Sequence, residues 1–144
     1  MRILLIHADY VNYEVETRGK FAEEITPDRK EGSLEDPLIA FVSIEENDEN
    51  SGTESGDLVE KAFREIRKVA SKIKVRNVAL FPFAHLSESL SSPDFAVSVL
   101  KDLEDRFKKS KFNSFRAPFG WYKEFEFRSK GHPLSILSRT VRLN

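Results

Sequence analysis

The chain of 144 residues contains no cysteine and no long apolar run. The absence of cysteine excludes disulfide bonds, thiolate metal sites and thiol nucleophiles, so any nucleophile is water, a hydroxyl, an amine or a carboxylate. No stretch approaches the roughly 18 apolar residues of a membrane helix, and residues 1–10 lack the basic flank and cleavage site of a signal peptide. These absences predict a soluble, cytoplasmic protein that makes no membrane contact.

Several patterns that bind cofactors or activate nucleophiles are also missing. The sequence has no glycine-rich loop for nucleotide phosphates, and no GxSxG motif surrounds Ser87, so a serine triad is not expected. His7, Asp9 and His132 have side chains that bind metals, but no HxxxH or HxH spacing relates them. We therefore expect neither a metal nor any other cofactor.

Charge is distributed unevenly along the chain. Residues 1–56 hold 5 Lys/Arg and 14 Asp/Glu, whereas residues 57–144 hold 18 and 10. From Arg106 onward, ten basic and eight aromatic residues accompany only two acids, Glu124 and Glu126. Interleaved cations and aromatics are typical of surfaces that bind nucleic acids, but they also occur in an amphipathic sheet whose aromatic residues form the core. Both interpretations remain open from composition alone.

Hydrophobic periodicity predicts strands and two helices. An apolar stripe with helical spacing begins at Asp57, which with Glu60 has the spacing of a capping box, and a second helix begins with Ser92 as cap and Pro93 in its first turn. Residues 47–56 are expected to form a loop, and Pro133 to start a short helical turn. The strands are expected at residues 2–9 and 12–16, paired as a hairpin, and at 38–44, 77–83, 112–115 and 121–128.

At this length, 40% hydrophobic residues can fill one core, so the whole chain, residues 1–144, is expected to form one domain. The order of its elements predicts an α/β fold, in which two main helices pack against a mixed β-sheet.

Two side chains stand out within this scheme. Lys123 falls on the aromatic face of strand 121–128, where an ammonium either reaches the edge of the core or meets an anion or a reacting group. His85 follows the buried strand 77–83 just beyond its carboxyl end, which is where ligands bind in sheets with helical crossovers, although a histidine there also serves as a structural loop residue.

Five segments carry a resemblance to a known family: MRILLIHADYVNYEV, FVSIEE, FPFAHLSESL, APFGWYKEF and KGHPLSILSRT. Together they resemble the N-terminal editing domain of archaeal threonyl-tRNA synthetase, a relative in fold of the D-aminoacyl-tRNA deacylases. The resemblance spans roughly residues 1–142. It implies hydrolysis of L-serine from threonine tRNA by a bound water, with help from the 2′-hydroxyl of the tRNA. It also implies a homodimer and, if the chain is excised from a longer synthetase, association with the remainder of that synthetase.

The resemblance also assigns residues to the site. A pocket built largely from backbone would be shaped by Ile44, Pro82, Ala84 and Phe119, with His85, Tyr122 and Lys123 as its catalytic polar side chains. One position departs from the family pattern, because Ile136 stands where relatives carry a glutamate, and an isoleucine neither accepts a proton nor orients water. A D-aminoacyl-tRNA deacylase and a noncatalytic RNA-binding module are the alternatives, and D- and L-aminoacyl substrates distinguish them.

Overall fold

The longest strand of the protein lies where a hairpin was expected. In the computed structural model, which describes residues 1–52 and 54–143, β1 runs without a turn over Arg2–Arg18. Its first half pairs with β3 (Pro37–Ser43) and β7 (Ile136–Thr140), and its second half with β2 (Glu31–Glu35) and β6 (Trp121–Ser129). The pairing with β6 shifts register twice, as in a bulged strand that bends sharply. The predicted hairpin is therefore wrong, because bulges bend this strand without interrupting it.

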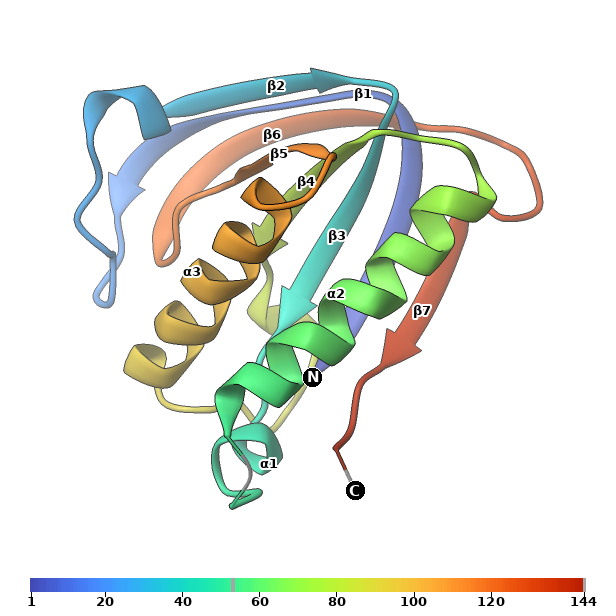
Figure 1. The fold of residues 1–144 in the computed structure, drawn as a ribbon. Helices are drawn as coiled ribbons and strands as arrows, with labels where there is room; N and C mark the ends of the chain where they lie inside the picture. Colours follow the sequence, from blue (N-terminus) through green and yellow to red (C-terminus); the bar gives the residue numbers. More distant parts are fainter. Residues whose placement is uncertain (53, 144) are drawn as a thin grey trace.

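The sheet combines parallel and antiparallel strands. β4 (Asn77–Pro82) pairs in parallel with β3 on one side and with β5 (Asn113–Arg116) on the other. The order β2-β1-β3-β4-β5, with β6 and β7 also on β1, gives seven strands in the described part of the chain (Figure 1). The carboxyl ends of the three parallel strands consequently meet at one edge.

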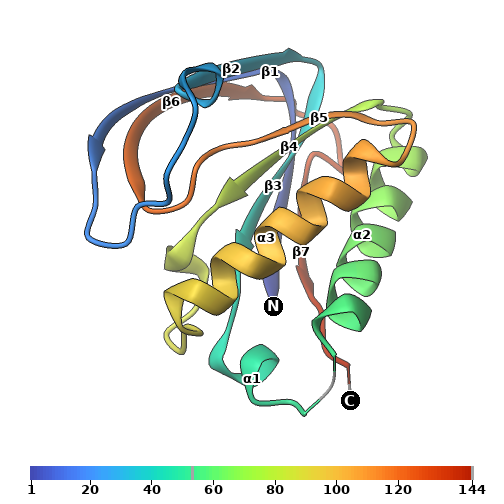
Figure 2. The ribbon, with the colours of Figure 1, turned by 60° about the vertical axis from the view of Figure 1, so that its left-hand side comes forward.

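Two helices, α2 (Ser55–Lys72) and α3 (Pro93–Lys108), cover one face of this sheet (Figure 2). Their apolar stripes form one core with alternate residues of β3, among them Leu38, Ala40 and Val42. Helix α3 begins as predicted, since the Ser92 hydroxyl accepts the Phe95 N–H at 3.3 Å. The predicted capping box of α2 is wrong: the helix starts at Ser55, and the N-cap residue before it, Glu54, makes no side-chain capping bond.

A second, aromatic core lies on the other face of the sheet. The rings of Phe41 and Phe81 lie 5.6 Å apart, and Phe125 of β6 lies 6.1 and 5.5 Å from them. Phe115 and Phe127 pack against the same cluster. The core interpretation is thus confirmed for Phe115 and Phe127, whereas Phe125 contacts the cluster with one part of its ring and is 40% exposed.

Several short elements were not expected from the sequence. Besides β2 and β7, these are η1 (Pro27–Arg29), α1 (Glu46–Glu49) and η2 (Ala84–Leu86). Helix α1 lies partly within the expected loop 47–56, and its capping box joins Glu45 to Asp48. No helix among the described residues has both the length and the apolarity to cross a membrane. The predicted fold class, one α/β domain with a mixed sheet and two main helices, is confirmed.

Candidate functional site

The carboxyl ends of β3, β4 and β5 bring most of the predicted site residues to one edge of the sheet. Val42 of β3 pairs with Pro82 of β4, and the Phe83 N–H continues the ladder by donating to the Val42 carbonyl at 2.9 Å. On the other side, the Ala117 N–H donates to the Leu80 carbonyl at 2.9 Å. The segments that leave these strands carry Ile44, the residues 82–85 and Phe119. In sheets with parallel strands, this edge is the usual place for a ligand.

The segment after β4 forms the exposed part of this edge. Ala84 and His85 open the short helix η2, and both are exposed. The imidazole of His85 lies edge-on to the Phe83 ring at 5.1 Å, and Phe83 in turn contacts Phe41 of the aromatic core at the same distance. His85 therefore stands on a rigid apolar base, and in the described structure its ring nitrogens make no hydrogen bond.

Ile44 and Phe119 contribute to the same edge from inside. The Ile44 side chain is 4% exposed and packs in the core beneath the helices, so its backbone is the part nearest the edge. Its carbonyl accepts the Ser91 N–H at 3.1 Å, which joins β3 to the segment between η2 and α3. Phe119 is half-buried and packs against this core as well.

Phe119 belongs to a tight turn, residues 117–120, that is clamped by residues 19–23. Gly120 adopts φ of 79°, and an added Cβ would lie 2.6 Å from the Phe21 carbonyl oxygen, so this position requires glycine. The Glu23 carboxylate accepts the Phe119 N–H at 2.7 Å, and the indole N–H of Trp121 donates to the Glu23 carbonyl at 2.8 Å. The clamp fixes the start of β6, which carries Tyr122 and Lys123.

Glu23 is itself held by a buried arginine. Arg116, only 2% exposed, binds both carboxylate oxygens of Glu23 at 2.5 and 3.1 Å and also binds Glu104 of α3 at 3.1 Å. Burial raises the pKa of Glu23, but the bonds from Arg116 and from the Phe119 N–H outweigh it, and the net shift is downward. The turn that carries Phe119 is thus tied to both β5 and α3.

Lys123 is half-buried, as its place on the apolar face indicated. Its ammonium donates to the Trp121 carbonyl at 2.8 Å and makes no ion pair in the described part of the chain. Burial lowers the pKa of Lys123, and the negative charge of Glu23 opposes this shift only in part. By contrast, the neighbouring Tyr122 points to the opposite side of β6 and is 69% exposed.

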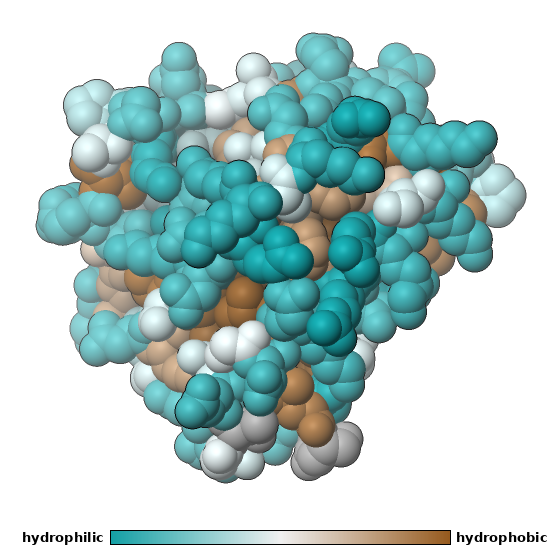
Figure 3. Space-filling view, viewed as in Figure 1, coloured by the Kyte–Doolittle hydropathy of each residue, from teal (hydrophilic) through white to brown (hydrophobic). Residues whose placement is uncertain are grey.

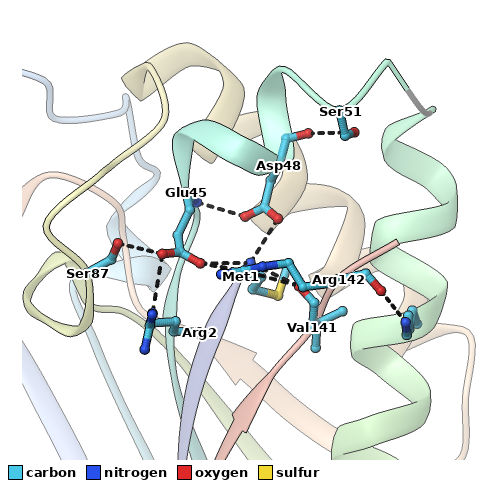
Figure 4. Close-up of polar contacts among 9 residues, drawn as sticks. Met1, Arg2, Glu45, Asp48, Ser51, Ser87, Val141 and Arg142 are labelled. Carbon is cyan, nitrogen blue, oxygen red and sulfur yellow. Dashed lines mark hydrogen bonds and ion pairs between the residues drawn. The ribbon is translucent and has the colours of Figure 1, made fainter. Parts of the chain in front are cut away.

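A second polar cluster lies at the end of β3 (Figure 4). The Glu45 carboxylate, which directly follows Ile44, accepts the Ser87 hydroxyl at 2.6 Å and Arg142 at 2.8 Å. The amino group of Met1 lies 3.2 Å from the same carboxylate. Burial opposes the charge, but these hydrogen bonds outweigh it and lower the pKa of Glu45 to about 2. Because Ser87 lies two residues after His85, Glu45 anchors the η2 segment to β3.

The three residues considered for a metal are engaged elsewhere. The Nδ1 atom of His7 lies 2.7 Å from Nε2 of His132, and Nε2 of His7 lies 2.7 Å from a carboxylate oxygen of Asp36. Asp9 instead binds Lys130 at 2.7 Å. Because each ring nitrogen of His7 is already in a hydrogen bond, these residues form a polar chain. Across residues 1–52 and 54–143, no group of three or more His, Cys, Asp or Glu side chains is arranged to hold a metal ion.

The arrangement divides the predicted site residues into two groups. One surrounds η2 and the ends of β3 and β4, and the other surrounds the turn at Phe119 and the start of β6. No hydrogen bond among the described residues links His85 to Lys123 or Tyr122. Ile136 begins β7, opposite Ile6 of β1, and is 58% exposed. Two surface hollows, of about 1250 and 280 Å³, are lined by other residues than the seven predicted ones.

Sequence patterns had not indicated the residues that support the two groups. Glu23, Arg116, Glu45 and Ser87 lie in four separate segments, and only folding brings them into pairs. The sole sequence signal was an arginine among the apolar residues of 112–117.

The sequence of this chain matches a family model over residues 1–141, described as the archaea-specific editing domain of threonyl-tRNA synthetase. The threonine–tRNA ligase of Methanococcoides burtonii is 51% identical over 143 residues, which are 99% of this chain and 22% of that protein. The corresponding ligase of Methanocaldococcus jannaschii is 48% identical over 143 residues, 98% of this chain and 22% of that protein. The chain therefore spans about a fifth of the length of these relatives.

A solved structure supports the fold independently of sequence similarity. The c-Myc DNA Unwinding Element Binding Protein superposes with a TM-score of 0.60 over 99% of both chains at 10% identity, which shows a shared fold and nothing about activity. The family match covers nearly the whole chain, and the relatives are about half identical to it. The chain belongs to the family of archaea-specific editing domains of threonyl-tRNA synthetase.

Proposed function

We propose that this chain, as one editing domain, hydrolyses L-serine from mischarged threonine tRNA in the cytoplasm, as part of a threonyl-tRNA synthetase or beside one. The family match, a model of an editing domain over residues 1–141, carries this proposal. The physical need is clear: a site that activates threonine gains only about 1–3 kcal/mol from one methyl group, which is too little to reject serine. A second site that excludes threonine by size corrects the error.

The pocket lies at the edge where β3, β4 and β5 end. Pro82, Ala84 and Phe119, with the backbone of Ile44, form its walls, and their chain segments are held by the Glu45 and Glu23 clusters. Such walls admit the serine side chain and collide with the additional methyl of threonine. Size selection of this kind requires rigid walls, which the two anchored segments supply.

Hydrolysis adds water to the ester carbonyl and breaks its bond to the ribose 3′-oxygen, releasing serine and the free tRNA end. Lys123 places or polarises the water, because its half-buried ammonium has, among the described residues, only the Trp121 carbonyl as hydrogen-bond partner. His85 and Tyr122 are exposed and contact the substrate. The adjacent 2′-hydroxyl handles the proton, since none of the described side chains forms a nucleophile–base pair in the pocket.

A comparison of three substrates tests the proposal. Purified protein is incubated with L-seryl-, L-threonyl- and D-aminoacyl-tRNA, and the release of each amino acid is followed in single turnover. We expect rapid release of L-serine alone. Release of D-amino acids alone would assign the chain to the D-aminoacyl-tRNA deacylases, and tight tRNA binding without any release would make it a noncatalytic RNA-binding module.

We further propose that the domain acts as a homodimer. Large apolar side chains remain exposed on β6 and β7, namely Ile136 at 58% and Phe125 at 40%. Burial of such side chains against a second copy would stabilise the assembly by removing apolar area from water. Sedimentation equilibrium of the purified chain measures this, and a monomer throughout the micromolar range would contradict it.

A further inference from the structure

The exposed cations of the two helices gather at one edge of the molecule. Between residues 61 and 76, seven Lys and Arg residues accompany a single acid, Glu65. At the end of α3 a second basic group follows, and the two lie side by side because the Asn113 N–H donates to the Arg76 carbonyl at 2.9 Å. We call the following residues the basic edge: Lys72, Lys74, Arg76, Lys109 and Lys111.

The basic edge is not accounted for by the needs of the fold. All five side chains are exposed, and within residues 1–52 and 54–143 none of them forms an ion pair or a side-chain hydrogen bond. Cations in the last turn of a helix offset its dipole by about 0.3–1 kcal/mol each, which accounts for Lys72 and Lys109. Lys74, Arg76 and Lys111 lie beyond the helix ends, where crowding of like charges costs stability.

The opposite side of the molecule carries the other sign of charge. Across the antiparallel strands β2, β1 and β6, the residues Glu31, Glu14 and Glu124 stand directly opposite one another in a row. None of these three exposed carboxylates forms an ion pair with another described residue. A polyanion is therefore repelled by this acidic sheet and attracted to the helix side, whose surface is largely hydrophilic (Figure 3).

The helices connect the basic edge to the proposed pocket. Helix α2 begins just after α1, close to the end of β3, and the Ser92 N–H at the start of α3 donates to Glu49 of α1 at 2.9 Å. Both helices then run to the opposite edge of the sheet, as Figure 1 shows. The 18 residues of α2 extend about 27 Å at about 1.5 Å per residue. A duplex that lies along α2 therefore presents several successive phosphates to the helix side.

We propose that the basic edge binds the phosphate backbone of the RNA duplex that adjoins the aminoacylated end held in the pocket. This inference rests on the proposed function for the identity of the RNA. A further set of cations on α2, namely Lys61, Arg64 and Lys68, lines the path between pocket and basic edge. The contacts are made to phosphates and not to bases, so they position the substrate without reading its sequence.

Binding of uncharged threonine tRNA tests the surface without requiring catalysis. The dissociation constant is measured by fluorescence anisotropy between about 50 and 200 mM salt for the wild type, for the double variant Lys72→Gln and Lys109→Gln, and for a control pair, Lys30→Gln and Arg128→Gln. Each lost phosphate contact removes about 0.9 from the slope of log affinity against log salt. We expect the first pair to flatten the slope by about 2 and the control pair to leave it unchanged.

Equal slopes for the wild type and the Lys72/Lys109 variant would overturn the proposal, as would equal flattening by both pairs, which would reflect net charge alone. A thermal melt adds a control for folding, since loss of the helix-dipole contributions of Lys72 and Lys109, about 0.3–1 kcal/mol each, should lower the melting temperature only slightly. Hydrolysis of a short seryl-CCA oligonucleotide, which does not reach the basic edge, should proceed at the same rate in both proteins. Failure to hydrolyse any seryl substrate would refute the proposed function and leave the binding result intact.

Discussion

Replacement of Glu45 by glutamine removes the charge at the end of β3 while keeping the size of the side chain. In the wild type, burial opposes that charge, but hydrogen bonds from Ser87, Arg142 and the amino group of Met1 lower the pKa of Glu45 from 4.5 to about 2. The side chain belongs to a residue that is only 5% exposed, so solvent screens these contacts little. A shift of this size corresponds to about 3 kcal/mol in the free energy of unfolding.

The sign of the effect determines its pH window. Because the pKa of Glu45 is lower in the folded than in the unfolded protein, its stabilisation is complete above pH of about 4.5 and is lost as the pH falls toward about 2. We expect Glu45→Gln to be less stable than the wild type at neutral pH by up to about 3 kcal/mol. The difference between the two proteins should shrink across the acid range, since the wild type alone loses this contribution there.

Urea unfolding at a series of pH values measures the effect. Glu88→Gln is the matched control, because Glu88 is exposed, lies in the same segment as Ser87 and has no partner among the described residues. A constant difference between Glu45→Gln and the wild type at all pH values would refute the electrostatic reasoning. With the Ser87 anchor weakened, seryl-tRNA hydrolysis by Glu45→Gln should also fall, whereas Glu88→Gln should retain it.

Four further predictions concern the proposed pocket. Lys123→Met should lower single-turnover hydrolysis of L-seryl-tRNA without lowering the melting temperature, because burial disfavours the charged ammonium; an unchanged rate with a lower melting temperature would assign Lys123 to the fold. His85→Ala should have a similar or smaller effect on the rate, and complete loss of activity would instead make His85 the general base. Ile136→Glu should raise the rate modestly or leave it unchanged, and a large loss in a folded variant would contradict this. A seryl-tRNA ending in 2′-deoxyadenosine should react about 10²-fold more slowly or worse at saturating enzyme, the scale of a positioned acid–base group, and normal turnover would exclude the 2′-hydroxyl.

The elements that the sequence predicted correctly are those with a strong local signal. The apolar residues of α2 and α3 repeat with the period of a helix, and the uninterrupted apolar run of β4 is typical of a buried strand. Strands β2 and β7 were missed because each lies at an edge and buries only part of its surface, so the sequences EGSLE and ILSRT have little apolar alternation. Strand β1 was predicted as two strands, because residues 8–11, where it bends, resemble a turn in composition.

Charge patterns along the chain predicted the surface poorly. The basic stretch after Arg106 contains β6, whose Glu124 lies opposite Glu14 of β1, which in turn lies opposite Glu31 of β2. The basic edge instead combines the ends of two helices that lie 37 residues apart at Lys72 and Lys109. Surface potential depends on which segments the fold brings together. A count of charges along the sequence does not show which segments become neighbours. The candidate RNA-binding surface is therefore assigned to the ends of the helices and not to the strands.

In the proposed pocket, the buried carboxylates of Glu45 and Glu23 would supply the rigidity that sorting substrates by size requires. A pocket that rejects one methyl must not yield when that methyl presses on its wall, since a movement of a few tenths of an ångström would admit threonine. Glu45 holds the η2 segment, and Glu23 holds the turn at Phe119, each through charge-assisted hydrogen bonds to a segment distant in sequence. Loss of either anchor should therefore reduce discrimination between L-seryl- and L-threonyl-tRNA as well as rate. A variant that hydrolysed both esters equally while remaining folded would locate the selection in these walls, whereas slower hydrolysis at unchanged selectivity would locate it elsewhere.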